Sequence, residues 1–153
     1  MLLTGATGDS LSLRVSGYQF PDAEDPRKRY SWHMVSGEAG SAEGSWDFEW
    51  QALTCDESPR VSAWLRAVAS QEGPAPLTFL EPNLRFRLAG DDAVGLVLKV
   101  DFDLEFLPPW NRHGYTGKPT TLRIAIGSEC LRAAADAWDE EREHGAATGR
   151  DRE

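Results

Sequence analysis

The sequence has few of the residues that build metal centres, disulfide frameworks or catalytic triads. It contains only two cysteines, Cys55 and Cys130, and only three histidines, His33, His113 and His144. The cysteines lie far apart and form no CxxC pair. We therefore expect neither a disulfide framework nor a zinc site, and a reducing compartment is the simpler interpretation. No histidine is accompanied by a serine or cysteine arranged as in a triad. We expect no cofactor and no metal.

Long apolar runs are missing as well. No segment approaches the roughly 18 consecutive apolar residues of a transmembrane helix, and residues 1–10 lack the basic and apolar stretches of a signal peptide. These absences favour a cytoplasmic protein. The opening MLLTGATG is similar to a dinucleotide-binding turn, but it lacks the preceding strand, the third glycine and the following helix. We expect residues 1–9 to be a loose N-terminal extension.

Basic residues are in deficit. Sixteen Lys and Arg against 25 Asp and Glu give a net charge of −9. This surplus argues against binding to nucleic acid or anionic membranes, and it favours a basic partner if the acids cluster. With 153 residues, 41% of them hydrophobic, the chain can fold as one domain. We expect a single domain over residues 10–143 and a disordered tail over 144–153.

The clearest structural pattern runs from Val94 to Phe106. Every second residue there is apolar, which is typical of a half-buried β-strand; these residues are Leu96, Leu98, Val100, Phe102, Leu104 and Phe106. The pattern predicts one long strand, ended by Pro108 and Pro109 because proline has no N–H for a sheet.

Shorter alternating segments predict further strands at residues 11–15, 30–39, 45–53, 77–80, 84–88 and 122–126, with a glycine-rich hairpin connection at 37–44. Helical periodicity begins instead at Ser58 and Ser128, both of a residue type that caps helices. We expect the second helix to fray over the acidic Asp139–Glu143, because negative charge opposes the dipole at this end. Strands and helices do not alternate regularly. The fold class is therefore α+β: a mainly antiparallel twisted sheet of about six to seven strands with two amphipathic helices.

The polar face of the long strand supplies the candidate binding residues. Asp101, Asp103 and Glu105 are spaced so that their carboxylates project from one face of a strand, with Cα atoms about 7 Å apart. Asp47 and Glu49 extend this acidic strip if the two strands are neighbours. A basic protein partner would screen the repulsion between these charges. If the strip is exposed, replacing Asp101 and Asp103 by Lys leaves the melting temperature nearly unchanged.

The same pattern has two other interpretations. An ordinary solvated sheet face is one, with the acids neutralised by Lys99, Arg85 and Arg87. The other is a carboxylate-based hydrolase, since the spacing lies in the range used by glycoside hydrolases. The sequence shows no apolar wall to raise the pKa of one carboxyl, so we do not expect an enzyme.

Trp110 follows two prolines and also has two interpretations. It is either an exposed aromatic anchor for a partner or a lid folded over the end of the sheet, and we favour the lid because large aromatics are mostly buried. The other five tryptophans lie on apolar stripes, and we expect them in the core: Trp32, Trp46, Trp50, Trp64 and Trp138.

Five segments, taken in order along the chain, resemble one small bacterial family: SGYQFP at 16–21, GSWDF at 44–48, LTFLEPNLRF at 77–86, FDLE at 102–105 and PPW at 108–110. The closing helix after Ile126 follows the same pattern, so the resemblance covers about Ser16 to Glu141. The family is that of WapI-type immunity proteins, cytosolic antidotes to wall-associated polymorphic toxins.

The resemblance implies stoichiometric binding rather than catalysis. Such a protein occupies a toxin domain, often a nuclease, that a neighbouring cell delivers. The resemblance assigns no toxin-contacting residue, so the acidic strip and Trp110 are expectations from the residue pattern alone. We expect a basic protein toxin domain as partner, no nucleic acid and no membrane, with the chain a monomer or a homodimer. The alternative is a non-catalytic binding or regulatory domain without a toxin partner.

Overall fold

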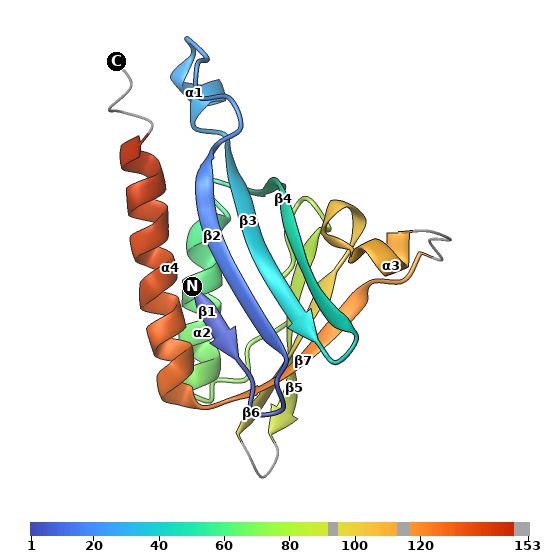
Figure 1. Cartoon of the computed structure of the whole chain (residues 1–153). Helices are drawn as coiled ribbons and strands as arrows, with labels where there is room; N and C mark the ends of the chain where they lie inside the picture. The colour runs from blue at the N-terminus through green and yellow to red at the C-terminus, as the bar shows by residue number, and fades with distance from the viewer. Residues whose placement is uncertain (92–94, 113–116, 149–153) are drawn as a thin grey trace.

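Two antiparallel sheets and two long helices make up the computed structural model, which describes residues 1–91, 95–112 and 117–148 (Figure 1). The first sheet has the strand order β1 (Leu2–Thr4), β2 (Ser10–Tyr18), β3 (Trp32–Ser41) and β4 (Gly44–Thr54). The second has the order β5 (Leu84–Asp91), β6 (Leu96–Phe102) and β7 (Thr120–Ile126). The long helices are α2 (Ser58–Ala69) and α4 (Ser128–Thr148); the short ones are α1 (Pro26–Arg29), the 3-10 turn η1 (Leu104–Phe106) and α3 (Pro109–Arg112).

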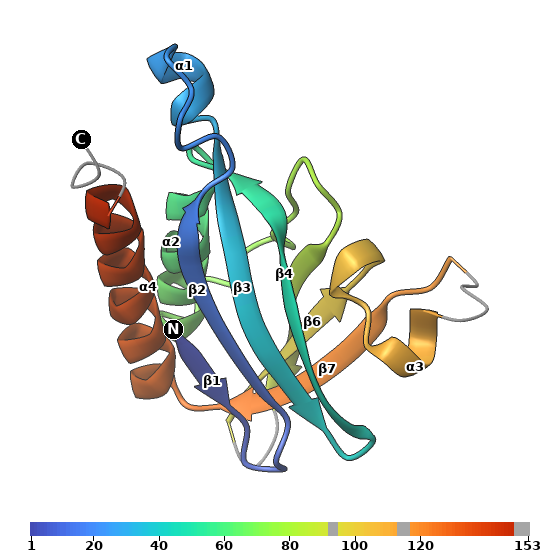
Figure 2. The ribbon, with the colours of Figure 1, turned by 45° about the horizontal axis from the view of Figure 1, so that its top comes forward.

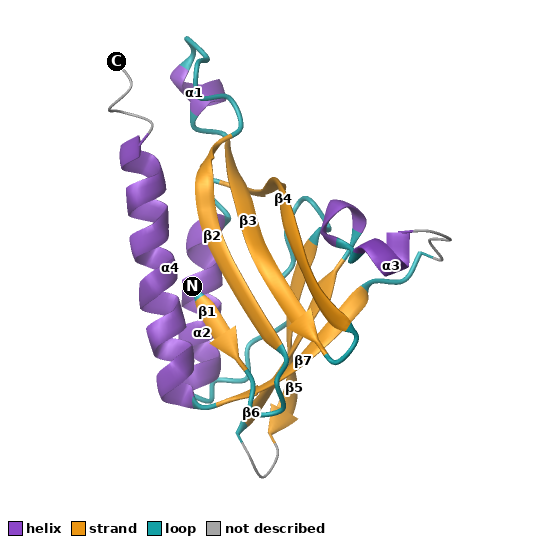
Figure 3. Cartoon of the chain, in the orientation of Figure 1, coloured by secondary structure: helices purple, strands orange, loops and turns teal. Residues whose placement is uncertain are grey.

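The elements form two layers (Figures 2 and 3). The four-stranded sheet is one layer, and the second layer consists of α2, α4 and the three-stranded sheet, whose strand β7 crosses behind β2–β4. The α+β class is confirmed. The expectation of a single sheet is wrong, because the seven described strands divide into sheets of four and three. Alternation indicates only that one face of a strand is buried. It does not distinguish one sheet covered by helices from two sheets packed face to face, because the same apolar side chains are buried in both.

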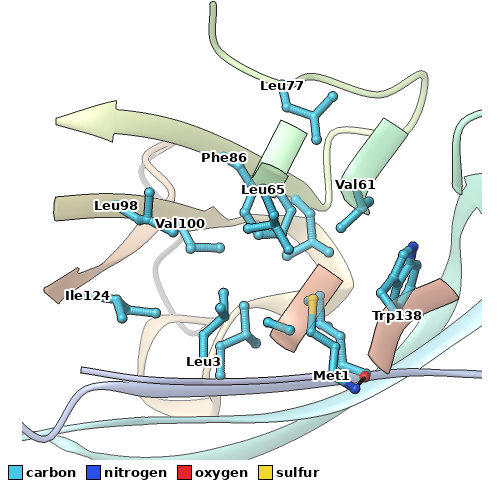
Figure 4. Close-up of a cluster of buried hydrophobic side chains, with 14 of the residues drawn as sticks. Met1, Leu3, Val61, Leu65, Leu77, Phe86, Leu98, Val100, Ile124 and Trp138 are labelled. Carbon is cyan, nitrogen blue, oxygen red and sulfur yellow. Dashed lines mark hydrogen bonds between the residues drawn. The ribbon is translucent and has the colours of Figure 1, made fainter. Parts of the chain in front are cut away.

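One hydrophobic core joins both layers (Figure 4). Apolar side chains of both sheets and both long helices converge there, among them Leu3, Val61, Leu65, Phe86, Leu98, Val100, Ile124 and Trp138. The indole Nε1 of Trp138 also donates a 2.8 Å hydrogen bond to the carbonyl oxygen of Ser58, which ties α4 to the start of α2. The core thus holds the four-stranded sheet and the second layer in one fixed arrangement.

β6 is shorter than the alternation predicts. It ends at Phe102, and Val94 lies outside the described residues. The carboxylate of Asp103 accepts a 2.8 Å hydrogen bond from the backbone N–H of Leu104, whose φ is +50°. A local bond of this kind competes with strand pairing and starts the turn η1. The prediction of one strand up to Phe106, ended by the prolines, is therefore wrong.

Both ends of the described chain are more ordered than predicted. Leu2–Thr4 pair with β2 and Leu3 is fully buried, so residues 1–9 are not a loose extension. At the other end α4 continues through His144 to Thr148, so a disordered tail beginning at 144 is also wrong. Residues 149–153 lie outside the described part, as does His113.

α2 begins at the predicted residue but not with the predicted cap. Its N-cap is Glu57, which makes no side-chain cap hydrogen bond, and Pro59 lies in the first turn. Ser58 is the first helical residue and is fully buried, with its hydroxyl near His33 rather than over the helix end.

The predicted fraying of α4 after Trp138 is also wrong. Asp139 lies within the helix and accepts hydrogen bonds from Ser62 and Arg66 of α2 and from Arg142 of α4. Because α4 continues to Thr148, Asp139 is not in the last turn, where the dipole would oppose its charge, and the charge-assisted bonds stabilise it. None of the described helices combines the length and the apolar composition needed to cross a membrane.

Candidate functional site

An open groove runs beside β4, the strand at one edge of the four-stranded sheet. Among the described strands β4 pairs only with β3, and η1 lies next to it (Figure 2). The groove has a volume of about 570 Å³ and is lined by Asp47, Phe48, Glu49, Trp50, Leu104, Glu105 and Arg112. Apolar surface rimmed by charged groups is typical of protein-interaction sites.

The alternation of β4 places two of the carboxylates. Trp46 and Phe48 point into the core and are buried, so Asp47 and Glu49 project from the opposite face and are exposed. These two residues belong to the four-stranded sheet, whereas Asp101 belongs to the other. They therefore do not extend a strip along β6.

Trp50 is a groove residue that we expected in the core. Strict alternation after the buried Trp46 and Phe48 would bury Trp50 as well, yet it is 36% exposed. The register shifts just beyond it, where Val35 lies opposite Trp50 but His33 lies opposite Leu53. A bulge of this kind changes the direction of side chains at a sheet edge.

η1 places Leu104 and Glu105 on the other wall of the groove. The N–H of Asp103 donates to the carbonyl of Asn83, which holds the start of the turn. The side-chain Nδ2 of Asn83 donates a 2.8 Å hydrogen bond to Glu105. Arg112 of α3 donates to two backbone carbonyls, one of them that of Glu105.

The groove therefore unites three of the six predicted binding residues. Asp47, Glu49 and Glu105 all line it, although Glu105 comes from a turn and not from a strand. Asp103 is half-buried, and one of its carboxylate oxygens accepts the hydrogen bond that caps η1.

Trp110 lies outside the groove lining, over the hairpin between β3 and β4. Its Nε1 donates a 3.0 Å hydrogen bond to Glu43, and its ring packs edge-on against Trp46 with the centroids 5.6 Å apart. The residue is still 40% exposed. Trp110 thus covers the hairpin with one side and faces solvent with the other.

Asp101 is the predicted residue that the fold removes from the surface. It is 6% exposed. Its carboxylate accepts two hydrogen bonds from Arg87, of 2.9 and 2.7 Å, and one of 2.6 Å from Thr121. Burial raises the pKa of Asp101, but these hydrogen bonds and the charges of Arg87 and Arg85 outweigh burial and lower it. The expectation of an exposed strip is wrong at this position.

The sheet face around Asp101 is basic rather than acidic. Cross-strand register surrounds this carboxylate with cations on β5, β6 and β7: Arg85, Arg87, Lys99 and Arg123. This arrangement agrees with the interpretation of the strand pattern as an ordinary sheet face, on which cations neutralise the acids. The acidic surface lies instead along β4 and η1.

Sequence reasoning missed a buried polar pair between β3 and α2. Nδ1 of His33 lies 2.7 Å from Oγ of Ser58, and the two residues are 5% and 0% exposed. Burial lowers the pKa of His33 to about 4, with a further contribution from the charge of Arg142. A nucleophilic serine must reach its substrate. Because Ser58 is enclosed, the pair contributes packing and hydrogen bonding to the fold.

Four groove residues were not indicated by the sequence as binding residues: Phe48, Trp50, Leu104 and Arg112. One signal for the turn was present, since Asp103 is of a capping residue type and Glu105 follows in the first turn. Within the described residues, no group of three or more His, Cys, Asp or Glu side chains is arranged to hold a metal ion.

Comparison with known proteins extends the resemblance beyond the segments noted above. No curated protein and no solved structure shows a match to this chain. The sequence profile of the Immunity protein WapI-like family matches residues 1–144, which include β1 and most of α4. The match covers far more than half of the chain and includes the residues of the groove. The chain therefore belongs to the WapI-like immunity protein family.

Proposed function

We propose that this protein neutralises a secreted toxin domain by binding it stoichiometrically, with the groove beside β4 as the contact surface. Family membership supports the toxin-neutralising role. One observation supports the groove as the contact surface. It brings together three carboxylates and two exposed apolar residues: Asp47, Glu49, Glu105, Trp50 and Leu104.

The composition of the groove indicates a basic partner. Three carboxylates face one cation, Arg112, whose N–H groups donate to backbone carbonyls. Lys or Arg side chains of a toxin domain would neutralise the remaining charge. Such complementarity accelerates association and selects the partner, while apolar contacts supply much of the affinity.

The proposed action is occupancy without catalysis. A general acid that works at neutral pH needs a carboxyl group held protonated by an apolar environment. Asp47, Glu49 and Glu105 are instead exposed in an open groove. We place this action in the cytoplasm, and the free state of Cys55 and Cys130 supports a reducing compartment.

Where the gene beside this one encodes a secreted protein, the C-terminal domain of that protein is the probe. Lack of such a gene would favour a binding domain without a toxin partner. Calorimetry measures the binding of the probe to the wild-type chain and to the Asp47→Lys/Glu49→Lys variant at low and at physiological salt. We expect a 1:1 complex, a Kd at least about tenfold higher for the variant, and a weaker salt dependence of its binding. Both substituted residues are exposed, so the melting temperature should stay within about 2 °C.

Asp22→Lys/Glu24→Lys is the matched control. It makes the same change in net charge in the exposed loop before α1, which contributes nothing to the groove. Equal Kd values for the two double variants would refute the groove as the contact surface. Absence of binding by the wild-type chain would refute the toxin-neutralising role with this domain and favour a binding domain without a toxin partner.

A further inference from the structure

Leu104 combines two properties that are unfavourable for a leucine. Its φ of +50° lies in the left-handed region, where the Cβ of an L-residue crowds its own backbone. The residue is also 41% exposed. Among the described residues only Gln71, with φ of +58°, is another non-glycine residue with positive φ. Strain of this kind persists where the surrounding structure imposes it, and it clusters at functional sites.

The surroundings of Leu104 impose this conformation through the backbone. Its N–H donates to the carboxylate of Asp103, and its carbonyl accepts a 3.1 Å hydrogen bond from the N–H of Leu107. The N–H of Asp103 is held by the carbonyl of Asn83, a fully buried residue. The turn is therefore anchored on both sides of Leu104, and the apolar side chain is presented rather than packed.

The groove around this side chain is acidic and partly aromatic. Leu104 lines it together with Trp50, and these are two of the six large hydrophobic residues that are exposed on the described surface. Asp47, Glu49 and Glu105 line the same groove. The charges favour a cationic surface opposite them, and the two apolar residues favour an apolar one.

We propose that Leu104 is the apolar anchor of the toxin complex, inserted into an apolar pocket of the toxin domain that is ringed by Lys or Arg side chains. This inference rests on the proposed function and adds the residue and the partner chemistry to it. The strained turn presents the side chain before binding, so little conformational freedom is lost when the complex forms. The carboxylates beside it pair with the cations at the rim of that pocket.

The test separates the side chain of Leu104 from its backbone. Leu104→Gly and Leu104→Asn place residues that tolerate positive φ at this position, whereas Leu104→Met keeps an apolar side chain. With the same toxin domain as probe, we expect the Kd to rise at least about tenfold for the Gly and Asn variants and to stay within about threefold for the Met variant. The melting temperatures of the Gly and Asn variants should equal or exceed that of the wild type.

Two control variants make the result specific. Leu80→Asn removes a leucine that is 71% exposed and lies outside the groove, and Gln71→Gly relieves the other positive φ. Both should leave the Kd unchanged. Tight binding by Leu104→Asn would overturn the anchor while leaving the proposed function intact. A melting temperature lowered by several degrees in the Gly and Asn variants would also overturn it, because it would make Leu104 a structural residue. Absence of wild-type binding would overturn both proposals.

Discussion

Arg87 and Asp101 form a two-point ion pair across β5 and β6. Nε of Arg87 lies 2.9 Å from Oδ2 of Asp101, and Nη2 lies 2.7 Å from Oδ1. Arg87 is partly exposed, but the Asp101 side chain is only 7% exposed, so the pair stabilises a carboxylate that is largely shielded from solvent. Thr121 completes the arrangement from β7.

We expect Asp101→Asn to lower the free energy of unfolding by about 1–3 kcal/mol, because the amide cannot accept the same set of hydrogen bonds. Asp101→Lys should cost more, since it places a cation among Arg85, Arg87 and Lys99. Urea unfolding measures both variants. The control is Asp47→Asn, which changes an exposed carboxylate and should shift the stability by less than about 0.5 kcal/mol. Equal stability of the Asp101 and Asp47 variants would contradict the buried pair.

His33 makes the stability depend on pH. Its pKa is about 4 in the folded chain against an ordinary value of 6.5, so the unfolded chain binds the proton first as the pH falls. The resulting stabilisation is complete above pH 6.5 and is lost as the pH falls toward 4, by about 3 kcal/mol in total. Urea unfolding at pH 7, 6 and 5 measures this loss.

His33→Gln is the control for this dependence. The amide does not titrate, so the variant should be less stable than the wild type at pH 7 but should show a flatter curve between pH 6.5 and 4. The lowered pKa values of Asp101 and Asp139 affect the stability only at more acidic pH than His33 does. The stabilisation from Asp139 is lost as the pH falls from 3.8 through about 2. A wild-type slope retained in the variant would assign the effect to another group.

Asp139 and Asp136 offer a matched pair on α4, because both accept hydrogen bonds from Arg66 of α2. Burial raises the pKa of Asp139, but hydrogen bonds from Ser62, Arg142 and Arg66 outweigh it and lower the pKa to about 2. The side chain of Asp139 is 27% exposed and that of Asp136 is 71% exposed. We expect Asp139→Asn to cost about 1–2 kcal/mol and Asp136→Asn less than about 0.5 kcal/mol in urea unfolding. Equal costs would show that neither the burial of Asp139 nor its hydrogen bonds with Ser62 and Arg142 strengthen the contact between the helices.

Gly37 has no room for a side chain. A Cβ at this position would collide with the carbonyl oxygen of Ser12 and would lie 2.8 Å from the ring of Phe48. We therefore expect Gly37→Ala to cost about 2–3 kcal/mol, because backbone must move. Gly40→Ala in the same strand would approach only the hydroxyl of Ser10, at 3.1 Å, and should cost less than about 1 kcal/mol. Thermal unfolding of the two variants tests the difference, and similar melting temperatures would contradict it.

Gly37 also shows where local sequence signals end. The glycine-rich segment 37–44 predicts a hairpin connection, but β3 runs to Ser41 and β4 begins at Gly44, so only Ala42 and Glu43 form the turn. Glycine stands at 37 because β2 and the ring of Phe48 come close there. That reason lies in residues about a dozen or more positions away along the chain, so no local pattern expresses it.

The alternation of apolar residues was sufficient to place the strands β2, β3, β4, β5, β6 and β7, and the helical spacing of apolar residues placed the helices α2 and α4. Together these patterns also indicated most of the core. These features depend on the period of the side chains, which is a property of each segment by itself. The ordered set of short segments likewise was sufficient to indicate the family. Tertiary structure decided which acids face water. Asp101 and Asp47 both alternate with apolar neighbours, but Asp101 is enclosed by Arg87 and Thr121 from other strands, whereas Asp47 lies on an edge strand beside an open groove. Exposure is set by neighbours that arrive from distant parts of the chain, so only the assembled sheets determine it.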